Sequence, residues 1–407
     1  MKDQITSNIF QEIIATLDIP ESAYEKAESR YKDLGDWFAR AESKCSKFDP
    51  HVYPQGSFRF GTVVRPLGAN DEYDLDLGCR LRRGVTKLTH TQKDLKTLIG
   101  LDMEEYRCAR RIENTLEEKH RCWRLRYEDQ MKFHMDTVPS IPEEAQRTRM
   151  LMEEMIKAGS ATPLAENITS FAGAITDDRL QNYSIISSSW RISNSEGYAR
   201  WFESRIKLSM ALLEKRAFEL KAARVDDLPA RKWKSPLQQA VQILKRHRDV
   251  AFADYPDNKP PSIIITTLAG VAYRGESDTA DALTQILSTM GSLINPATLR
   301  VSNPVNPAEN FAERWTDPKY QQLNLKGNFF RWLEAAKADL QNIGSARRVD
   351  LIVEQARSKL AAALNADSLK AKLGNGGGGT LLKAAAAPAG LSFPAKPLIP
   401  AKPAGFA

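Results

Sequence analysis

The chain is poor in cysteine and histidine, and it has no long hydrophobic run. Its 407 residues include four cysteines and five histidines, and no two cysteines form a C-x-x-C pair. The longest apolar stretch, Ile263–Tyr273, is far shorter than the roughly 20 residues that a membrane span needs. The N-terminal segment MKDQITSNIFQEII lacks the apolar region and the cleavage site of a signal peptide. These absences exclude a disulfide-stabilised secreted domain and a helical membrane protein, and we expect a protein of the reducing cytoplasm without a membrane partner.

Positive charge gathers near the C-terminus instead of spreading over the chain. The net charge is +7, and residues 366–407 hold five lysines and one aspartate, which leaves +3 for the rest. A body with so little net charge attracts a long nucleic acid only weakly, so we expect no strong nucleic-acid partner. The hydrophobic content of 42% and the charged content of 27% are typical of a soluble globular protein.

Hydrophobic spacing and composition divide the chain into four predicted parts. The hydrophobic spacing of residues 1–45 predicts N-terminal helices, which we expect to pack on a mixed core spanning 46–215. Mostly helical patterns follow over 216–365, where we expect a C-terminal lobe that closes over a bound nucleotide. Residues 366–407 are rich in Gly, Ala, Pro and Lys, and we expect them to form a flexible tail. The predicted fold class is α+β, with two lobes and the active site between them.

Two aspartates alternate with apolar residues on one predicted strand. In the segment EYDLDL, Asp74 and Asp76 share one face, whereas Tyr73, Leu75 and Leu77 point into a core. Two carboxylates on one strand face repel each other unless a cation lies between them. Mg²⁺ suits such oxygen ligands and binds substrate phosphates at the same time. A solvated strand face is the alternative when this D-x-D motif is taken alone.

A later strand pattern adds a third carboxylate. The segment KFHMDTVP predicts a strand with Lys132, His134 and Asp136 on one face, and Cys122–Tyr127 predicts the other arm of a hairpin. Asp136, placed at a strand end, would complete a carboxylate triad with the D-x-D motif. Two Mg²⁺ ions about 3.5–4 Å apart would then activate an attacking hydroxyl and hold a triphosphate.

A glycine-serine turn precedes both carboxylate strands. The segment QGSFRFGT places Gln55, Gly56 and Ser57 side by side in the sequence. Glycine lets the backbone approach a ligand closely, and serine offers an N–H and a hydroxyl to phosphate oxygens. An ordinary surface turn is the alternative for this motif alone, but the order of the three motifs favours a nucleotide site.

The three motifs in this order resemble the signature of polymerase-β-like nucleotidyltransferases. The longer segments YPQGSFRFGTVVRP, EYDLDLGC and FHMDTVPS resemble the bacterial cGAS/DncV-like nucleotidyltransferases (CD-NTases) of CBASS anti-phage systems. This resemblance implies a polymerase-β-like core in a bacterial cytoplasmic enzyme that uses Mg²⁺, with Mn²⁺ as the other candidate ion. It also implies that the catalytic, metal-binding residues are Asp74, Asp76 and Asp136, and that the triphosphate is held by Gln55, Gly56 and Ser57.

Two predicted helix starts supply further phosphate-binding candidates. Ser235-Pro236 predicts the start of a helix that carries Lys245. Ser262 begins the next predicted helix, where free N–H groups and the helix dipole favour a phosphate. The family resemblance implies that Lys245 and Ser262 bind nucleotide phosphates. The alternative is a solvated basic face beside an ordinary helix cap.

The resemblance implies a synthase that joins ATP, GTP or other NTPs into a cyclic di- or trinucleotide, and an adenine-containing trinucleotide is favoured. A nucleotidyltransferase that makes linear oligonucleotides or extends RNA would use the same residues and is the alternative. A catalytically silent nucleotide-binding scaffold is the third hypothesis, and the presence of all three carboxylates disfavours it. The resemblance also implies an effector protein that senses the product. For the tail it suggests a ubiquitin-like ligase that acts on the C-terminal Ala407, and an idle disordered tail is the equal alternative.

Overall fold

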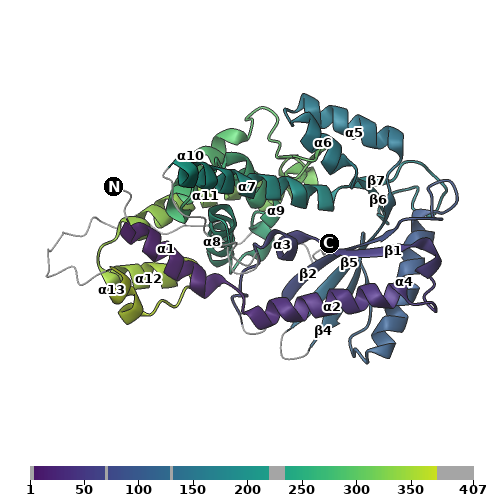
Figure 1. The fold of residues 1–407 in the computed structure, drawn as a ribbon, viewed down its shortest axis with the longest axis horizontal. Coiled ribbons are helices and arrows are strands. Elements are labelled where there is room, and N and C mark those ends of the chain that lie inside the picture. Colours follow the sequence, from purple (N-terminus) through teal and green to yellow (C-terminus); the bar gives the residue numbers. More distant parts are fainter. Residues whose placement is uncertain (1–3, 69–71, 129–131, 220–233, 374–407) are drawn as a thin grey trace. The chain divides into compact units, whose positions relative to one another are not determined.

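The structure is a computed structural model that describes residues 4–68, 72–128, 132–219 and 234–373 (Figure 1). The chain divides into two compact units. The sheet unit comprises Ile19–Ser204 and Asn303–Glu309. The helical unit comprises the described residues of Met1–Asp18, Arg205–Ser302 and Asn310–Lys402. The division between the two units falls at Ser204, inside a helix, whereas the sequence suggested a boundary after residue 215.

The sheet unit is built on a mixed sheet of seven strands. Its main path runs through β1 (Pro50–Pro54), β2 (Tyr73–Leu81), β5 (Phe133–Pro142), β4 (Trp123–Tyr127) and β3 (Glu117–Glu118). The end of β5 also pairs with β6 (Gly173–Ile175), which pairs with β7 (Arg191–Ser193). β2 and β5 run parallel, whereas the other pairs are antiparallel. The strand predicted around the D-x-D motif and the hairpin predicted around Asp136 are therefore both present.

Two long helices, α2 (Glu21–Ala39) and α4 (Gln92–Ala109), pack beside the sheet (Figure 1). Their buried residues share a hydrophobic core with it. Leu75 and Leu77 of β2 are buried in this core, as the alternation predicted. α4 begins with a capping box in which the Thr91 hydroxyl and the Asp94 carboxylate each accept a hydrogen bond from the other residue's N–H. The remaining helices of the unit are α3 (Gly56–Phe60), α5 (Ala145–Lys157), α6 (Thr162–Thr169) and the first part of α7 (Ser195–Glu219).

The helical unit is arranged around α8 (Pro236–Ala251), which has a buried apolar face. α8 packs against α1 (Gln4–Leu17), α9 (Ser262–Ala272), α10 (Thr279–Thr289), α11 (Leu325–Ser345) and α12 (Val349–Leu360). A two-stranded sheet of β8 (Ser302–Asn303) and β9 (Asn306–Asn310) lies between α10 and α11 in the sequence, and its residues Asn303–Glu309 belong to the sheet unit. No helix in the described part of the chain combines the length and apolarity of a membrane span.

The first helix departs from the predicted domain layout. α1 packs in the helical unit, against α8, α10 and α11, and of the two N-terminal helices only α2 packs on the sheet. The buried residues of α1 form one apolar stripe. Thr6 Oγ1 of the same helix donates a hydrogen bond to the Gly344 carbonyl at 2.7 Å. The spacing of apolar residues predicts such a stripe but does not identify its partner, which lies more than two hundred residues away in the sequence.

The sequence also placed the start of the flexible tail too early, at residue 366. Residues Ala366–Leu373 form α13, with Leu369 fully buried. The Asn365 side-chain oxygen accepts hydrogen bonds from the N–H groups of Asp367 and Ser368, and Lys372 pairs with Glu12 of α1. A cap and one anchored leucine order this segment despite its composition. The rest of the predicted tail, residues 374–407, lies outside the described residues.

The packing of α1 can be tested by truncating Ile13, which is fully buried. Ile13→Ala should lower the free energy of unfolding by about 2–5 kcal/mol, because it removes buried methyl groups and leaves a cavity. The matched control is Leu88→Ala, at a side chain that is 77% exposed, and its effect should stay within about 0.5 kcal/mol. Chemical denaturation of both variants measures the difference. Equal effects would contradict the assignment of α1 to a packed position.

Candidate active site

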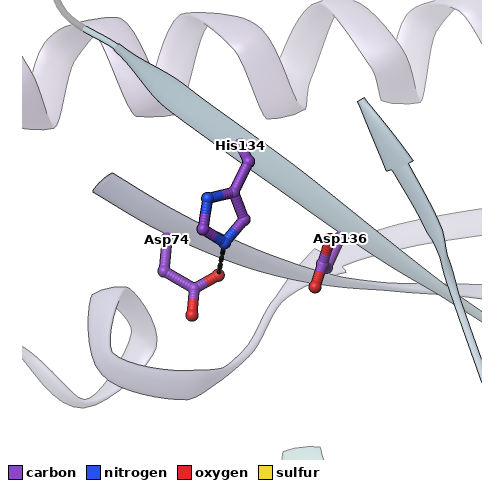
Figure 2. A group of neighbouring side chains, drawn as sticks. All are labelled: Asp74, His134 and Asp136. Atoms are coloured by element: carbon purple, nitrogen blue, oxygen red, sulfur yellow. Dashed lines mark ion pairs between the residues drawn. The ribbon is translucent and has the colours of Figure 1, made fainter. Parts of the chain in front are cut away.

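The parallel pair β2 and β5 brings the predicted carboxylates together. In its register Asp74 lies opposite His134, and Asp76 lies opposite Asp136. One ligand atom from each of Asp74, His134 and Asp136 lies within 4.8 Å of the others (Figure 2). Asp136 lies inside β5, as its fourth residue, and not at the strand end that the sequence suggested. The strand continues past it because residues 137–140 pair with β2 and residues 140–142 pair with β6.

The predicted glycine-serine turn lies directly against Asp76. A Cβ atom on Gly56 would come within 2.0 Å of Asp76 Oδ2, and Gly56 has a φ of +62°. The backbone N–H of Gln55 donates to the Asp76 carbonyl at 2.9 Å, and its side chain donates to the Leu77 carbonyl at 3.0 Å. Ser57 follows in the first turn of α3. Gly56 is therefore required both for its backbone conformation and for the space that the carboxylate fills.

Asp136 is buried and paired with an arginine from the neighbouring strand. Arg124 donates two hydrogen bonds to it, Nε to Oδ1 at 2.7 Å and Nη2 to Oδ2 at 2.6 Å. The side-chain hydrogen bond to Asp136 raises the pKa of Arg124 further above its ordinary value. This bidentate contact compensates a carboxylate that is only 3% exposed. The sequence analysis gave Arg124 no role at the site. The alternation in the segment WRLRY did indicate that Arg124 and Arg126 lie on the same face of their strand.

His134 contacts Asp74 and was also missed as a functional residue. Its Nε2 lies 2.9 Å from Asp74 Oδ1, and its Nδ1 lies 3.0 Å from Glu72 Oε2. Burial of the imidazole lowers its pKa, but the hydrogen bond and the charge of Asp74 outweigh this, so the pKa lies above the ordinary value. The alternation had placed His134 on the face of Asp136 without giving it a role.

The donor atoms of this site fit a hard divalent cation. Asp74 and Asp136 supply carboxylate oxygens, and Asp76 lies beside Asp136 in the strand register. Each carboxylate oxygen has more than one acceptor position, so a hydrogen bond from Arg124 or His134 leaves lone pairs for an ion. The group within 4.8 Å contains His134 with two of the three predicted aspartates. The full triad of aspartates stays a prediction, supported by the strand register.

Lys245 and Ser262 lie in the helical unit. α9 begins at Ser262, and Ser235 forms a capping box with Gln238 at the start of α8, as the sequence predicted. The alternative of a solvated basic face is wrong, because the side chains from Lys245 to Arg248 are all buried. Arg248 links the two helices by donating to the Ser262 hydroxyl at 2.8 Å. Binding of phosphate by Lys245 and Ser262 stays a prediction.

Comparison with known protein families identifies the sheet that carries this site. Residues 50–139 match the family model of the nucleotidyltransferase domain of DncV-like cyclic GMP-AMP synthases. The matched segment contains the glycine-serine turn, both carboxylate strands and Arg124. The expected family resemblance is thereby confirmed for this part of the chain.

Two curated relatives extend the similarity over most of the chain. A c-di-GMP synthase from Roseivirga ehrenbergii is 26% identical over 358 residues, which cover 85% of this chain and 83% of the relative. The cyclic dinucleotide synthase CdnG from Bradyrhizobium diazoefficiens is 26% identical over 348 residues, which cover 81% of this chain and 75% of the relative. Both relatives are named as synthases of cyclic dinucleotides.

Solved structures show the same fold. The structure of CdnG from Bradyrhizobium diazoefficiens in complex with GTP has a TM-score of 0.62 and 22% identity, and the match covers 88% of this chain and 96% of that chain. DncV from Vibrio cholerae, in complex with a linear intermediate, has a TM-score of 0.52 and 15% identity, with 89% of this chain and 88% of that chain covered. These matches confirm the predicted α+β nucleotidyltransferase fold.

The close approach of Gly56 to Asp76 can be tested with Gly56→Ala. We expect at least about tenfold weaker binding of a divalent cation, because the new methyl group displaces the Asp76 carboxylate. Gly159→Ala is the matched control, since Gly159 also has a positive φ but no atom within 4 Å of the added Cβ. The control should cost only about 1–2 kcal/mol of stability from backbone strain. Mn²⁺ titration and thermal unfolding of both variants separate the two effects, and unchanged Mn²⁺ affinity in Gly56→Ala would contradict the role of this turn.

Proposed function

We infer that this chain, which carries a nucleotidyltransferase domain of the DncV-like family, joins nucleoside triphosphates into a cyclic oligonucleotide. The single observation that carries the proposal is the parallel register of β2 and β5, which aligns Asp74 and Asp76 with His134 and Asp136 beside the Gly56 turn. That arrangement lies within the segment that matches the family model. It supports an enzyme over a silent nucleotide-binding scaffold.

The relatives support a cyclic dinucleotide as the product. One is named a c-di-GMP synthase and the other a cyclic dinucleotide synthase, and the structure of the latter holds GTP. We therefore propose a guanine-containing cyclic dinucleotide, with GTP among the substrates and ATP as a second candidate. The adenine-containing trinucleotide favoured by the sequence stays untested, and these names do not support it.

The proposed roles follow from the positions of the side chains. Asp74, Asp76 and Asp136 would hold divalent ions, with Mg²⁺ as the first candidate and Mn²⁺ as the second. Such ions lower the pKa of an attacking hydroxyl and offset the charge of the triphosphate. Arg124 fixes the buried Asp136 carboxylate in one orientation through its two hydrogen bonds. The Gly56-Ser57 turn would receive the triphosphate next to Asp76.

The wider biological role is proposed from the family resemblance. The product would be read by an effector protein during anti-phage defence in the bacterial cytoplasm, where NTPs are available. One protein of this fold, CdnC from E. coli, was solved in a complex with a HORMA protein. Action of a ubiquitin-like ligase on Ala407 and the alternative of an idle tail both stay predictions from the family resemblance, because Ala407 lies outside the described residues.

Product analysis tests the proposed reaction. The purified protein is incubated with four NTPs and Mg²⁺ or Mn²⁺, treated with phosphatase, and analysed by mass spectrometry. We expect a phosphatase-resistant cyclic dinucleotide, formed at least about 10²-fold more slowly by Asp76→Ala. Asp350→Ala, at an exposed aspartate of α12, should behave like the wild type. Phosphatase-sensitive linear oligomers would instead favour the alternative of a linear product.

Lys245→Met tests the predicted phosphate contact in the helical unit. The substitution keeps an apolar stem of similar length in this buried position and removes the charge. If Lys245 binds the nucleotide equally in the ground state and the transition state, KM for the NTP rises while kcat changes little. Lys337→Met, at an exposed lysine of α11, is the matched control. Unchanged KM in Lys245→Met would contradict the assignment.

A further inference from the structure

A line of opposite charges crosses the sheet and ends at Asp74. It starts at Glu117 of β3, which accepts from Arg126 Nε at 2.8 Å. Arg126 Nη1 lies 3.5 Å from Glu72, and Glu72 lies 3.0 Å from His134 Nδ1. His134 Nε2 then meets Asp74 Oδ1 at 2.9 Å. The line joins side chains from β2, β3, β4 and β5 together with Glu72, the residue directly before β2.

Asp74 is the carboxylate that most needs such support. Its side chain is 55% exposed, whereas Asp136 is buried under Arg124 and Asp76 fits against Gly56. An exposed aspartate samples several rotamers, and a cation must order it on binding, which costs free energy. His134 is only 16% exposed and is fixed by Glu72, so it offers a rigid partner to Asp74.

We propose that His134, oriented by Glu72, is a positioning residue that holds Oδ1 of Asp74 and leaves Oδ2 to bind a divalent ion. Figure 2 shows the imidazole directed at the Asp74 carboxylate. The inference rests on the proposed function, because it takes Asp74 as a metal ligand. Hydrogen bonds to metal-binding carboxylates are common, and their loss typically weakens metal binding 10–100-fold.

Direct binding of the ion by His134 is the competing role. The imidazole belongs to the group of ligand atoms within 4.8 Å, and nitrogen ligands suit Mn²⁺ less well than oxygen. The observed Nε2–Oδ1 distance of 2.9 Å is that of a hydrogen bond, so Nε2 is already engaged with the carboxylate. The geometry therefore favours positioning over direct coordination.

The experiment measures Mn²⁺ binding to the full chain by the EPR signal of free Mn²⁺. His134→Phe removes both ring nitrogens and should weaken binding about 10–100-fold. His134→Gln places an amide N–H close to the position of Nε2 and should restore most of the affinity. Glu72→Met removes the acceptor that orients His134 and should weaken binding in the same direction, but less. Thermal unfolding of each variant confirms that the fold is intact.

His120→Phe is the matched control, because His120 also pairs with an aspartate, Asp178, at 2.8 Å, but lies outside the candidate site. It should leave Mn²⁺ affinity unchanged. Asp136→Ala tests the site itself: a wild type that binds no Mn²⁺, or binds it independently of Asp136, contradicts the proposed metal site. Binding that depends on Asp136 but is unaffected by His134→Phe overturns the positioning role alone.

Pulsed EPR of the bound Mn²⁺ separates positioning from direct coordination. A positioning residue should give no strong nitrogen hyperfine coupling in the wild type. A strong coupling that disappears in His134→Phe would show an imidazole ligand and overturn the inference. Failure of His134→Gln to restore affinity, with its fold intact, would likewise count against a role that depends on donation to Asp74.

Discussion

Parallel pairing between β2 and β5 decides which side chains meet at the candidate site. In this register the pairs Asp74–His134 and Asp76–Asp136 lie on the same face of the sheet. A slip of one residue would turn the polar set of one strand into the core. The leucines that alternate with the aspartates on β2 are buried in the core shared with α2 and α4, and this burial fixes the register. The packing of the core therefore also determines where the carboxylates lie.

The concentration of negative charge on that face is compensated by the protein itself. Arg124 binds both oxygens of the buried Asp136, and His134 contacts the exposed Asp74. Repulsion between neighbouring carboxylates would otherwise oppose the strand pairing that brings them together. These hydrogen bonds leave further acceptor positions on the carboxylate oxygens, so the same arrangement that stabilises the fold fits the proposed divalent ion.

Much of the site could be predicted because it follows from local patterns. Alternation placed Asp74 and Asp76 on one face, and turn chemistry singled out Gly56 and the helix start at Ser262. The contacts of Arg124 and His134 were missed because they depend on strand register: Arg124 lies opposite Asp136 in the β4–β5 pair, and His134 lies opposite Asp74 in the β2–β5 pair. The same holds for the helices: α1 and α13 carry readable apolar positions, but their partners lie far away in the sequence.

The three carboxylates proposed as metal ligands illustrate three ways of fixing a side chain before an ion binds. Asp136 is held by a bidentate arginine in a buried position, where removing the partner would leave an uncompensated charge. Asp76 is confined by the space beside Gly56. Asp74 depends on a partly exposed line of charges, in which each member contributes modestly. Preorganised charge is most effective where it cannot relax, and Asp74, at the exposed end of the proposed metal site, is the carboxylate that is least fixed. A substitution there should therefore change the affinity of the proposed site with the smallest effect on the fold.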